Sequence, residues 1–183
     1  MSRKTKVIAV SGVSGSGKTT VTKCLGDRLR NSESLFFDDY IWKDSPEDLV
    51  KWVKEGADYG LWNLEPLVKD VMTLFESVDP PSFILLDYPF SYQNQGMKDW
   101  IDLSIYIDTP LDVALGRRIL RDYKNGTASE IHKDITFYLE KGRRAYEEME
   151  ATIKVDADYI VGGKLPVERI VELILSKLKE GVL

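Results

Sequence analysis

The sequence is poor in the residues that build disulfide frameworks and zinc sites, with one cysteine, Cys24, and one histidine, His132, among 183 residues. A single cysteine excludes an internal disulfide and is typical of proteins in a reducing compartment, so we expect a cytoplasmic protein. No Cys/His spacing indicates a zinc site. The search for chemistry therefore turns to other side chains.

Long apolar runs and excess positive charge are also missing. No stretch approaches the ~18 apolar residues of a membrane span, so we expect no membrane partner. The formal net charge is −5, from 25 Lys and Arg against 30 Asp and Glu, which argues against nucleic acid as a partner. A polyanionic ligand would have to meet a local concentration of positive charge.

Short apolar segments alternate with helical patterns along the chain. We predict strands over 6–11, 34–37, 82–86, 103–107 and 159–161. We predict helices over 18–30, 45–55, 64–77, 111–123, 129–150 and 166–179. Ser45 is expected to cap the helix 45–55. Strands that alternate with helices predict an α/β class with a parallel sheet, and the chain length fits a single domain, 1–183.

A glycine-rich loop carries the strongest functional signal, because it fits the pattern G-x-x-x-x-G-K-[ST] between a predicted buried strand and an amphipathic helix. Its glycines let successive backbone N–H groups point at one anion, and the helix adds its positive N-terminal end. Lys18 supplies a point charge to phosphates, and the Thr19 hydroxyl can bind Mg²⁺. We therefore expect ATP and Mg²⁺ as cofactors, held by Gly12, Val13, Ser14, Gly15, Ser16, Gly17, Lys18, Thr19 and Thr20.

Acidic residues follow several predicted strands, at the edge where ligands bind in open α/β sheets. Phosphoryl transfer to a hydroxyl needs one carboxylate to accept its proton and another to hold Mg²⁺ directly or through water. Asp38, twenty residues beyond Lys18, is the candidate for the first task. Asp87 is the candidate for the second, and Asp39 is an additional candidate beside Asp38.

The predicted helix 111–123 holds a dense basic cluster in an acidic protein. Arg117 and Arg121 lie four residues apart on one face, with Arg118 beside them. Arginine suits the clamping of a phosphoryl group in transfer. A second cluster, of Trp42, Trp52, Tyr59 and Trp62 with Asp58 nearby, could either stack on a planar base or fill the core.

Four segments together resemble the uridine kinase and nicotinamide riboside kinase family of P-loop kinases. They are V-S-G-V-S-G-S-G-K-T-T, then D-D-Y, then D-T-P-L-D-x-A-L-x-R-R-I-L-R-D, and near the end A-D-Y-I-V-x-G-x-x-x-x-E-R-I. The resemblance covers most of the chain and is weakest over 41–77. It implies a three-layer P-loop fold, with a five-stranded parallel sheet of order 2-3-1-4-5, helices on both faces and a helical lid.

The resemblance also implies roles for individual residues. Asp38 matches the catalytic base that activates a ribose 5′-hydroxyl, and Asp87 matches the position associated with Mg²⁺. Arg117, Arg118 and Arg121 match lid arginines, with the lid over about 111–128. The acceptor would bind in an insertion over about 40–78. The candidate contacts are Tyr40 and Asp58 within it, and Asp38 and Asp39 just before it.

The sequence departs from the family in three places. Asp87-Tyr88-Pro89 stands where the family usually has Glu-Gly, Lys124-Asn125-Gly126 replaces an arginine-rich continuation, and the nucleoside-recognition region is shorter. We predict an ATP-dependent kinase for a small nucleoside-like acceptor. A nucleotide-binding protein with lost or regulatory activity, a kinase for a non-nucleoside acceptor, and a homo-oligomer stay open. A GTPase switch is disfavoured, because no N-K-x-D motif occurs.

Overall fold

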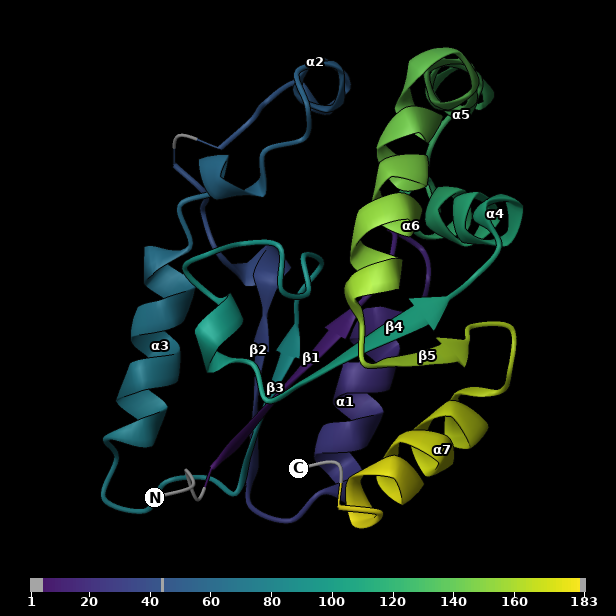
Figure 1. Ribbon diagram of the computed structural model, residues 1–183. Coiled ribbons are helices and arrows are strands. Elements are labelled where there is room, and N and C mark those ends of the chain that lie inside the picture. The colour runs from purple at the N-terminus through teal and green to yellow at the C-terminus, as the bar shows by residue number, and fades with distance from the viewer. Residues whose placement is uncertain (1–4, 44, 182–183) are drawn as a thin grey trace.

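The protein has three layers, a parallel sheet between two layers of helices, in a computed structural model that describes residues 5–43 and 45–181 (Figure 1). The strands are β1 (Lys6–Ser11), β2 (Ser32–Phe36), β3 (Phe83–Asp87), β4 (Leu103–Asp108) and β5 (Tyr159–Gly162). Their order is β2-β3-β1-β4-β5, and neighbouring strands run parallel. The predicted fold class and sheet order are confirmed.

The central strand β1 is apolar over residues 7–10 because helices cover both of its faces. Successive side chains of a strand point to opposite faces. Val7 and Ala9 accordingly join the core on one side of the sheet, and Ile8 and Val10 join the core on the other. All four side chains are fully buried.

Helices α1 (Lys18–Arg28) and α7 (Val167–Lys179) pack against one another and on the face that presents Ile8 and Val10. Leu25 of α1 and Ile174 of α7 are fully buried there. This packing fixes α1 against the sheet, so the N-terminal end of α1 is held at the carboxyl end of β1, where the glycine-rich loop lies.

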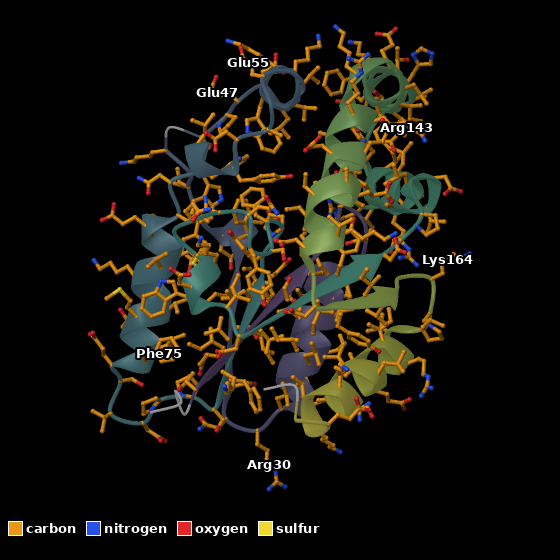
Figure 2. All side chains as sticks on the ribbon, in the orientation of Figure 1. Arg30, Glu47, Glu55, Phe75, Arg143 and Lys164 are labelled. Atoms are coloured by element: carbon orange, nitrogen blue, oxygen red, sulfur yellow. The ribbon has the colours of Figure 1, made fainter. Side chains whose placement is uncertain are left out.

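The opposite face is covered by α3 (Glu65–Phe75) and α6 (Arg143–Asp156). Leu67 and Val71, one helical turn apart on α3, are buried in the same core as Val7, and so is Ile153 of α6. At the end of α3, the ring of Phe75 (labelled in Figure 2) lies 5.7 Å from that of Trp100.

Helices α2 (Leu49–Lys54), α4 (Leu111–Asp122) and α5 (Ala128–Phe137) lie beyond the carboxyl edge of the sheet (Figure 1). Figure 2 places Glu47 and Glu55, which flank α2, at that end of the molecule and Arg30 at the other. Short 3₁₀ turns occur at Phe37–Asp39, Tyr59–Leu61 and Lys98–Trp100. The elements that can surround a ligand are therefore gathered at one end.

Two predicted helices differ from the structure. Helix α2 begins at Leu49, and its cap is Asp48, whose carboxylate accepts from the N–H groups of Val50 and Lys51 at 3.0 Å each. The prediction of a cap at Ser45 was wrong, because the Ser45 hydroxyl donates to the carbonyl of Trp42 instead.

The predicted helix 129–150 is longer than expected and is interrupted. A π-turn at Tyr138–Gly142 separates α5 from α6, which runs on to Asp156. A Cβ at Gly142 would lie 3.1 Å from the ring of Phe137, so glycine lets that ring pack closely against the turn. Among the described residues, no helix combines the length and apolar character needed to cross a bilayer.

Candidate active site

The glycine-rich loop follows β1 and leads into α1, the arrangement that its sequence predicts. Gly12, Gly15 and Gly17 have φ angles of 146°, 84° and 102°, a region that other residues resist. At Gly15 a Cβ would also lie 2.1 Å from the carbonyl oxygen of Ala114 in α4. The loop is therefore shaped by backbone torsions that need glycine and by a close approach to α4.

Two side chains from other elements hold this loop through the backbone carbonyl of Ser16. The Thr109 hydroxyl, just after β4, donates to it at 2.9 Å, and the Arg117 guanidinium of α4 donates at 3.5 Å. Arg117 also donates to the carbonyl of Gly163 after β5, at 3.0 Å. The loop is thus tied to the ends of β4 and β5 and to the first turns of α4.

A cleft of about 590 Å³ opens over the loop, large enough for a small-molecule ligand. It brings together residues from α1, the turn after β2, and α4, three elements that are distant in the sequence. Its lining residues are Gly15, Gly17, Lys18, Thr19, Thr20, Asp38, Arg117 and Arg121. The positive charge that an acidic protein needs for a polyanion is therefore concentrated here, beside one carboxylate.

Asp87 ends β3 directly behind this cleft, and the Thr19 hydroxyl donates to its carboxylate at 2.5 Å. Asp87 is 3 % exposed, and its second oxygen has no hydrogen-bond partner within the described part of the chain. Burial raises the pKa of this carboxyl, while Lys18 and the hydrogen bond from Thr19 oppose the rise. A positive ion would stabilise the ionised form.

These donors fit magnesium. Within residues 5–43 and 45–181, no three His, Cys, Asp or Glu side chains cluster in a way that could hold a metal by themselves. Mg²⁺ bound with a nucleotide usually takes only one or two protein ligands and completes its shell with phosphates and water. A hydroxyl at Thr19 and a partly unpartnered carboxylate at Asp87 are such a pair.

A second pocket, of about 250 Å³, lies next to the cleft and shares Lys18, Asp38 and Arg121 with it. We call it the acceptor pocket. Five of its eleven other lining residues are aromatic, and these five come from the segment after β2 and the loop after β3. These aromatic residues are Phe37, Trp52, Tyr59, Trp62 and Phe90.

Two of the three polar atoms of these rings are engaged within the protein, and the third, the Trp62 indole N–H, has no partner among the described residues. The Trp52 indole donates to the Asp58 carbonyl at 2.9 Å, and the Tyr59 hydroxyl bonds that of Thr152. The pocket therefore offers ring faces more than hydrogen-bonding groups, which suits a flat ligand. Trp42 lies outside it and stacks on Phe37, with ring centroids 4.4 Å apart.

The three arginines of α4 have different surroundings. Arg117 and Arg121 line the cleft, and the Arg121 guanidinium lies 3.4 Å from the Ser14 hydroxyl while it pairs with Asp122. Arg118 faces elsewhere, because both its terminal nitrogens bind the carboxylate of Asp134 in α5, at 2.7 and 3.0 Å. The structure thus brings two of the predicted arginines to the phosphate loop.

Three predicted acceptor contacts do not line either pocket. The Asp58 carboxylate accepts from the N–H of Gly60, and the Tyr40 hydroxyl donates to Asp70 at 2.8 Å. Asp39 is exposed beside Asp38. Conversely, Phe37 and Phe90 line the acceptor pocket and were not singled out in the sequence. The only signal for Phe90 is its place three residues after Asp87.

No protein-family model matches the chain. Among curated proteins, a uridine kinase from Anoxybacillus flavithermus is 28% identical, with 98% of this chain and 96% of that protein covered. A uridine kinase from Staphylococcus epidermidis is 29% identical over 86% of this chain and 87% of its own, and one from Ligilactobacillus salivarius is 27% identical over 97% and 94%.

Solved structures share the fold at lower identity. A sugar kinase from Janibacter sp. HTCC2649 matches with a TM-score of 0.60 and 19% identity, over 97% of this chain and 96% of that one. Shikimate kinase from Aquifex aeolicus matches with a TM-score of 0.57 and 21% identity, over 97% and 98%. The chain therefore has the P-loop kinase fold, and its predicted resemblance to the uridine kinase family is confirmed.

Proposed function

We propose that this protein is an ATP-dependent kinase that phosphorylates the 5′-hydroxyl of a nucleoside or riboside. One observation carries the proposal: Lys18, Asp38 and Arg121 line both the cleft over the phosphate loop and the acceptor pocket. A hydroxyl in one cavity and a terminal phosphate in the other would therefore meet at these three side chains.

Each of the three has a task in such a transfer. Asp38 accepts the proton of the acceptor hydroxyl as the new oxygen–phosphorus bond forms and the bond to the leaving ADP oxygen breaks. Lys18 and Arg121 offset the negative charge on the transferring group, with Arg117 at the edge of the same cleft. Magnesium bound by Thr19 and Asp87 would neutralise charge on the phosphate oxygens.

The walls of the acceptor pocket support a nucleoside-like acceptor. Five aromatic rings can stack on a planar base, while Lys18 and Arg121 supply the positive charge near the transfer point. An acceptor such as an acidic sugar derivative would need charged or polar groups on the walls that these rings occupy. The uridine kinases among the relatives support the same acceptor class. The single cysteine supports a cytoplasmic location.

The first test replaces the proposed base. Asp38→Asn is expected to lower phosphoryl transfer by ~10²-fold or more, because the amide cannot accept the proton, while the affinity for Mg·ATP stays nearly unchanged. Turnover is measured by ADP formation with a panel of nucleosides, nicotinamide riboside and nucleoside monophosphates, and ATP affinity by calorimetry.

Asp39→Asn is the matched control, since Asp39 is the neighbouring exposed carboxylate and lines neither pocket. It should retain near wild-type turnover. Equal losses in the two variants would contradict the role of Asp38. Tight ATP binding with no turnover on any acceptor would favour a nucleotide-binding protein without kinase activity.

A further inference from the structure

A larger cavity adjoins the acceptor pocket. Its volume is about 440 Å³, against about 250 Å³ for the acceptor pocket, and the two share Leu49 of α2 and Ala145 of α6. We call this cavity the annex. Lys18, Asp38 and Arg121 do not line it. The shared wall gives a molecule with its hydroxyl at Asp38 a route into the annex.

The interior of the annex is mainly apolar. It lies between α2 on one side and α5, the π-turn and α6 on the other. Phe137 and Leu49, on the two sides, are 52 % and 43 % exposed, so both offer apolar surface that the folded chain leaves uncovered. The apolar lining residues are Leu49, Val50, Phe137, Tyr138, Ala145 and Tyr146. Such walls favour an apolar group.

The charged groups around the annex are predominantly acidic: three carboxylates and one guanidinium. The guanidinium, Arg118, is bound in a two-pronged pair by Asp134, and the Asp48 carboxylate caps α2. This leaves the exposed carboxylates of Glu47 and Asp48 as the charges that a ligand can meet. The annex therefore favours a positive group over a negative one.

Tyr138 lines the annex, and its hydroxyl is buried in the wall. Its side chain is 4 % exposed, and its hydroxyl has no hydrogen-bond partner within residues 5–43 and 45–181. Buried hydroxyls are normally hydrogen-bonded, so a missing partner suggests a ligand or water. Burial raises the pKa of this phenol. The phenol is neutral at pH 7 and adds no negative charge to the annex.

We propose that the annex is the far end of the acceptor site and takes an apolar group that ends in an amine. Its place beside the acceptor rests on the proposed function, whereas the preference for an apolar amine rests on the cavity alone. Burial of methylenes is expected to strengthen binding by about fourfold for each group buried, and an exposed carboxylate adds about two- to fivefold for an amine.

Binding of two probes with the same ring and opposite charge tests the preference without turnover. We expect 3-phenylpropylamine to bind the full chain at least about fivefold more tightly than 3-phenylpropanoate in calorimetric titrations. Glu47→Gln should weaken the amine by about two- to fivefold, and Phe137→Ala should weaken both probes.

Both substituted side chains are exposed, so these variants are expected to fold. Glu55→Gln is the matched control, because Glu55 flanks the same helix (Figure 2) but does not line the annex, and it should change neither affinity. The preference would be overturned if the amine and the acid bound with equal affinity. It would also be overturned if neither Glu47→Gln nor Phe137→Ala changed the affinity for the amine.

A turnover measurement separates the kinase proposal from the annex proposal. It compares uridine with uridines that carry an aminopropyl group at ring position 4 or 5. A lower KM for an aminopropyl compound than for uridine, lost in Glu47→Gln and kept in Glu55→Gln, supports the annex as part of the acceptor site. Phosphorylation of uridine with no such gain for either compound overturns the annex and leaves the kinase proposal intact. Amine discrimination without turnover of any acceptor overturns the kinase proposal alone.

Discussion

Asp38 and Asp87 are two carboxylates at one site with opposite surroundings. Asp87 is buried behind the phosphate loop and receives a hydrogen bond from Thr19, whereas Asp38 is exposed and lines both cavities. Environment separates the tasks of paired carboxylates. The buried one can face a metal throughout a reaction cycle, and the exposed one can meet each incoming acceptor.

Asp87→Asn is expected to stabilise the free protein while it impairs magnesium use. The pKa of Asp87 is raised in the folded state by burial, so its contribution to stability is fully present below the unfolded pKa and is lost as pH rises through the folded pKa. At pH 7 the negative charge of Asp87 therefore lowers the free energy of unfolding. We expect the melting temperature at pH 7 to rise by roughly 2–4 °C, and turnover to need more Mg²⁺.

The stabilisation should shrink as the pH is lowered through the folded pKa of Asp87, because the wild-type carboxyl then becomes neutral as well. Calorimetric melting of both proteins at several pH values measures it. A wild-type protein that is more stable than Asp87→Asn at pH 7 would contradict the prediction.

Site residues could be predicted from the sequence where a local motif fixes their position. Lys18 and Asp38 could be placed because the loop and its spacing fix them relative to the sheet. Asp58 and Tyr40 could not, because their positions depend on how the insertion packs: one caps a turn and the other binds Asp70. Phe90 was not predicted, because the sequence Tyr-Pro-Phe does not indicate which of its two aromatic rings lines a cavity.

At the scale of elements, α4 is fastened at its N-terminal end. Ala114 lies against Gly15, and Arg117 binds carbonyls after β5 and in the phosphate loop. The lid predicted over about 111–128 therefore has its first turns anchored to the core. The turn that precedes α5 is also held, because Thr127 and Glu130 form a capping box there.

The Arg118–Asp134 pair joins α4 to α5, and its two side chains are 15 % and 14 % exposed. Removing either partner leaves a partly buried charge, so we expect Arg118→Met and Asp134→Asn each to cost about 2–3 kcal/mol of unfolding free energy. The double variant should cost less than the sum, with a coupling of about 1 kcal/mol or more. Urea denaturation of the four proteins measures it; additive losses would contradict the pairing.

The same pair gives a defined pH response. The hydrogen bond from Arg118 lowers the pKa of Asp134, so the pair's contribution is present above the unfolded carboxyl pKa of about 3.9 and is lost as pH falls through the lower folded pKa. The wild-type advantage over Asp134→Asn should therefore be constant from pH 5 to 8 and fade only in stronger acid.

Strands were predicted more accurately than helix ends. A strand buried on both faces shows as a run of apolar residues, as over residues 7–10 of β1. The start of α2 was misplaced because Ser45 and Asp48 are both plausible caps, and the choice depends on what else each side chain can bind. The π-turn at Tyr138–Gly142 leaves no periodic signal, since it adds a single residue to a continuous helix.

At the scale of the whole molecule, the nucleotide cleft, the acceptor pocket and the annex follow one another at the carboxyl end of the sheet. Neighbouring cavities share wall residues. The cleft and the acceptor pocket share Lys18, Asp38 and Arg121, and the acceptor pocket and the annex share Leu49 and Ala145. Segments from distant parts of the chain form these walls, so ligand binding is coupled to the stability of the whole domain.

Mg·ATP should accordingly raise the melting temperature of the entire chain. At a concentration 100 times its Kd, a ligand of the native state adds ~2.7 kcal/mol, which for a chain of this size corresponds to roughly 5–10 °C. Differential scanning fluorimetry measures the shift. Lys18→Ala should reduce it strongly, and an undiminished shift in that variant would place the nucleotide elsewhere.

The π-turn between α5 and α6 sets the rotation of one helix about its axis relative to the other. Each residue of an α-helix advances the side-chain direction by about 100° around the helix axis. The extra residue of the π-turn therefore determines which way the side chains of α5 point relative to those of α6. Loss of one residue there would leave both helices intact yet turn Asp134 away from Arg118. In this segment the number of residues, as well as their identity, determines where the side chains of α5 point.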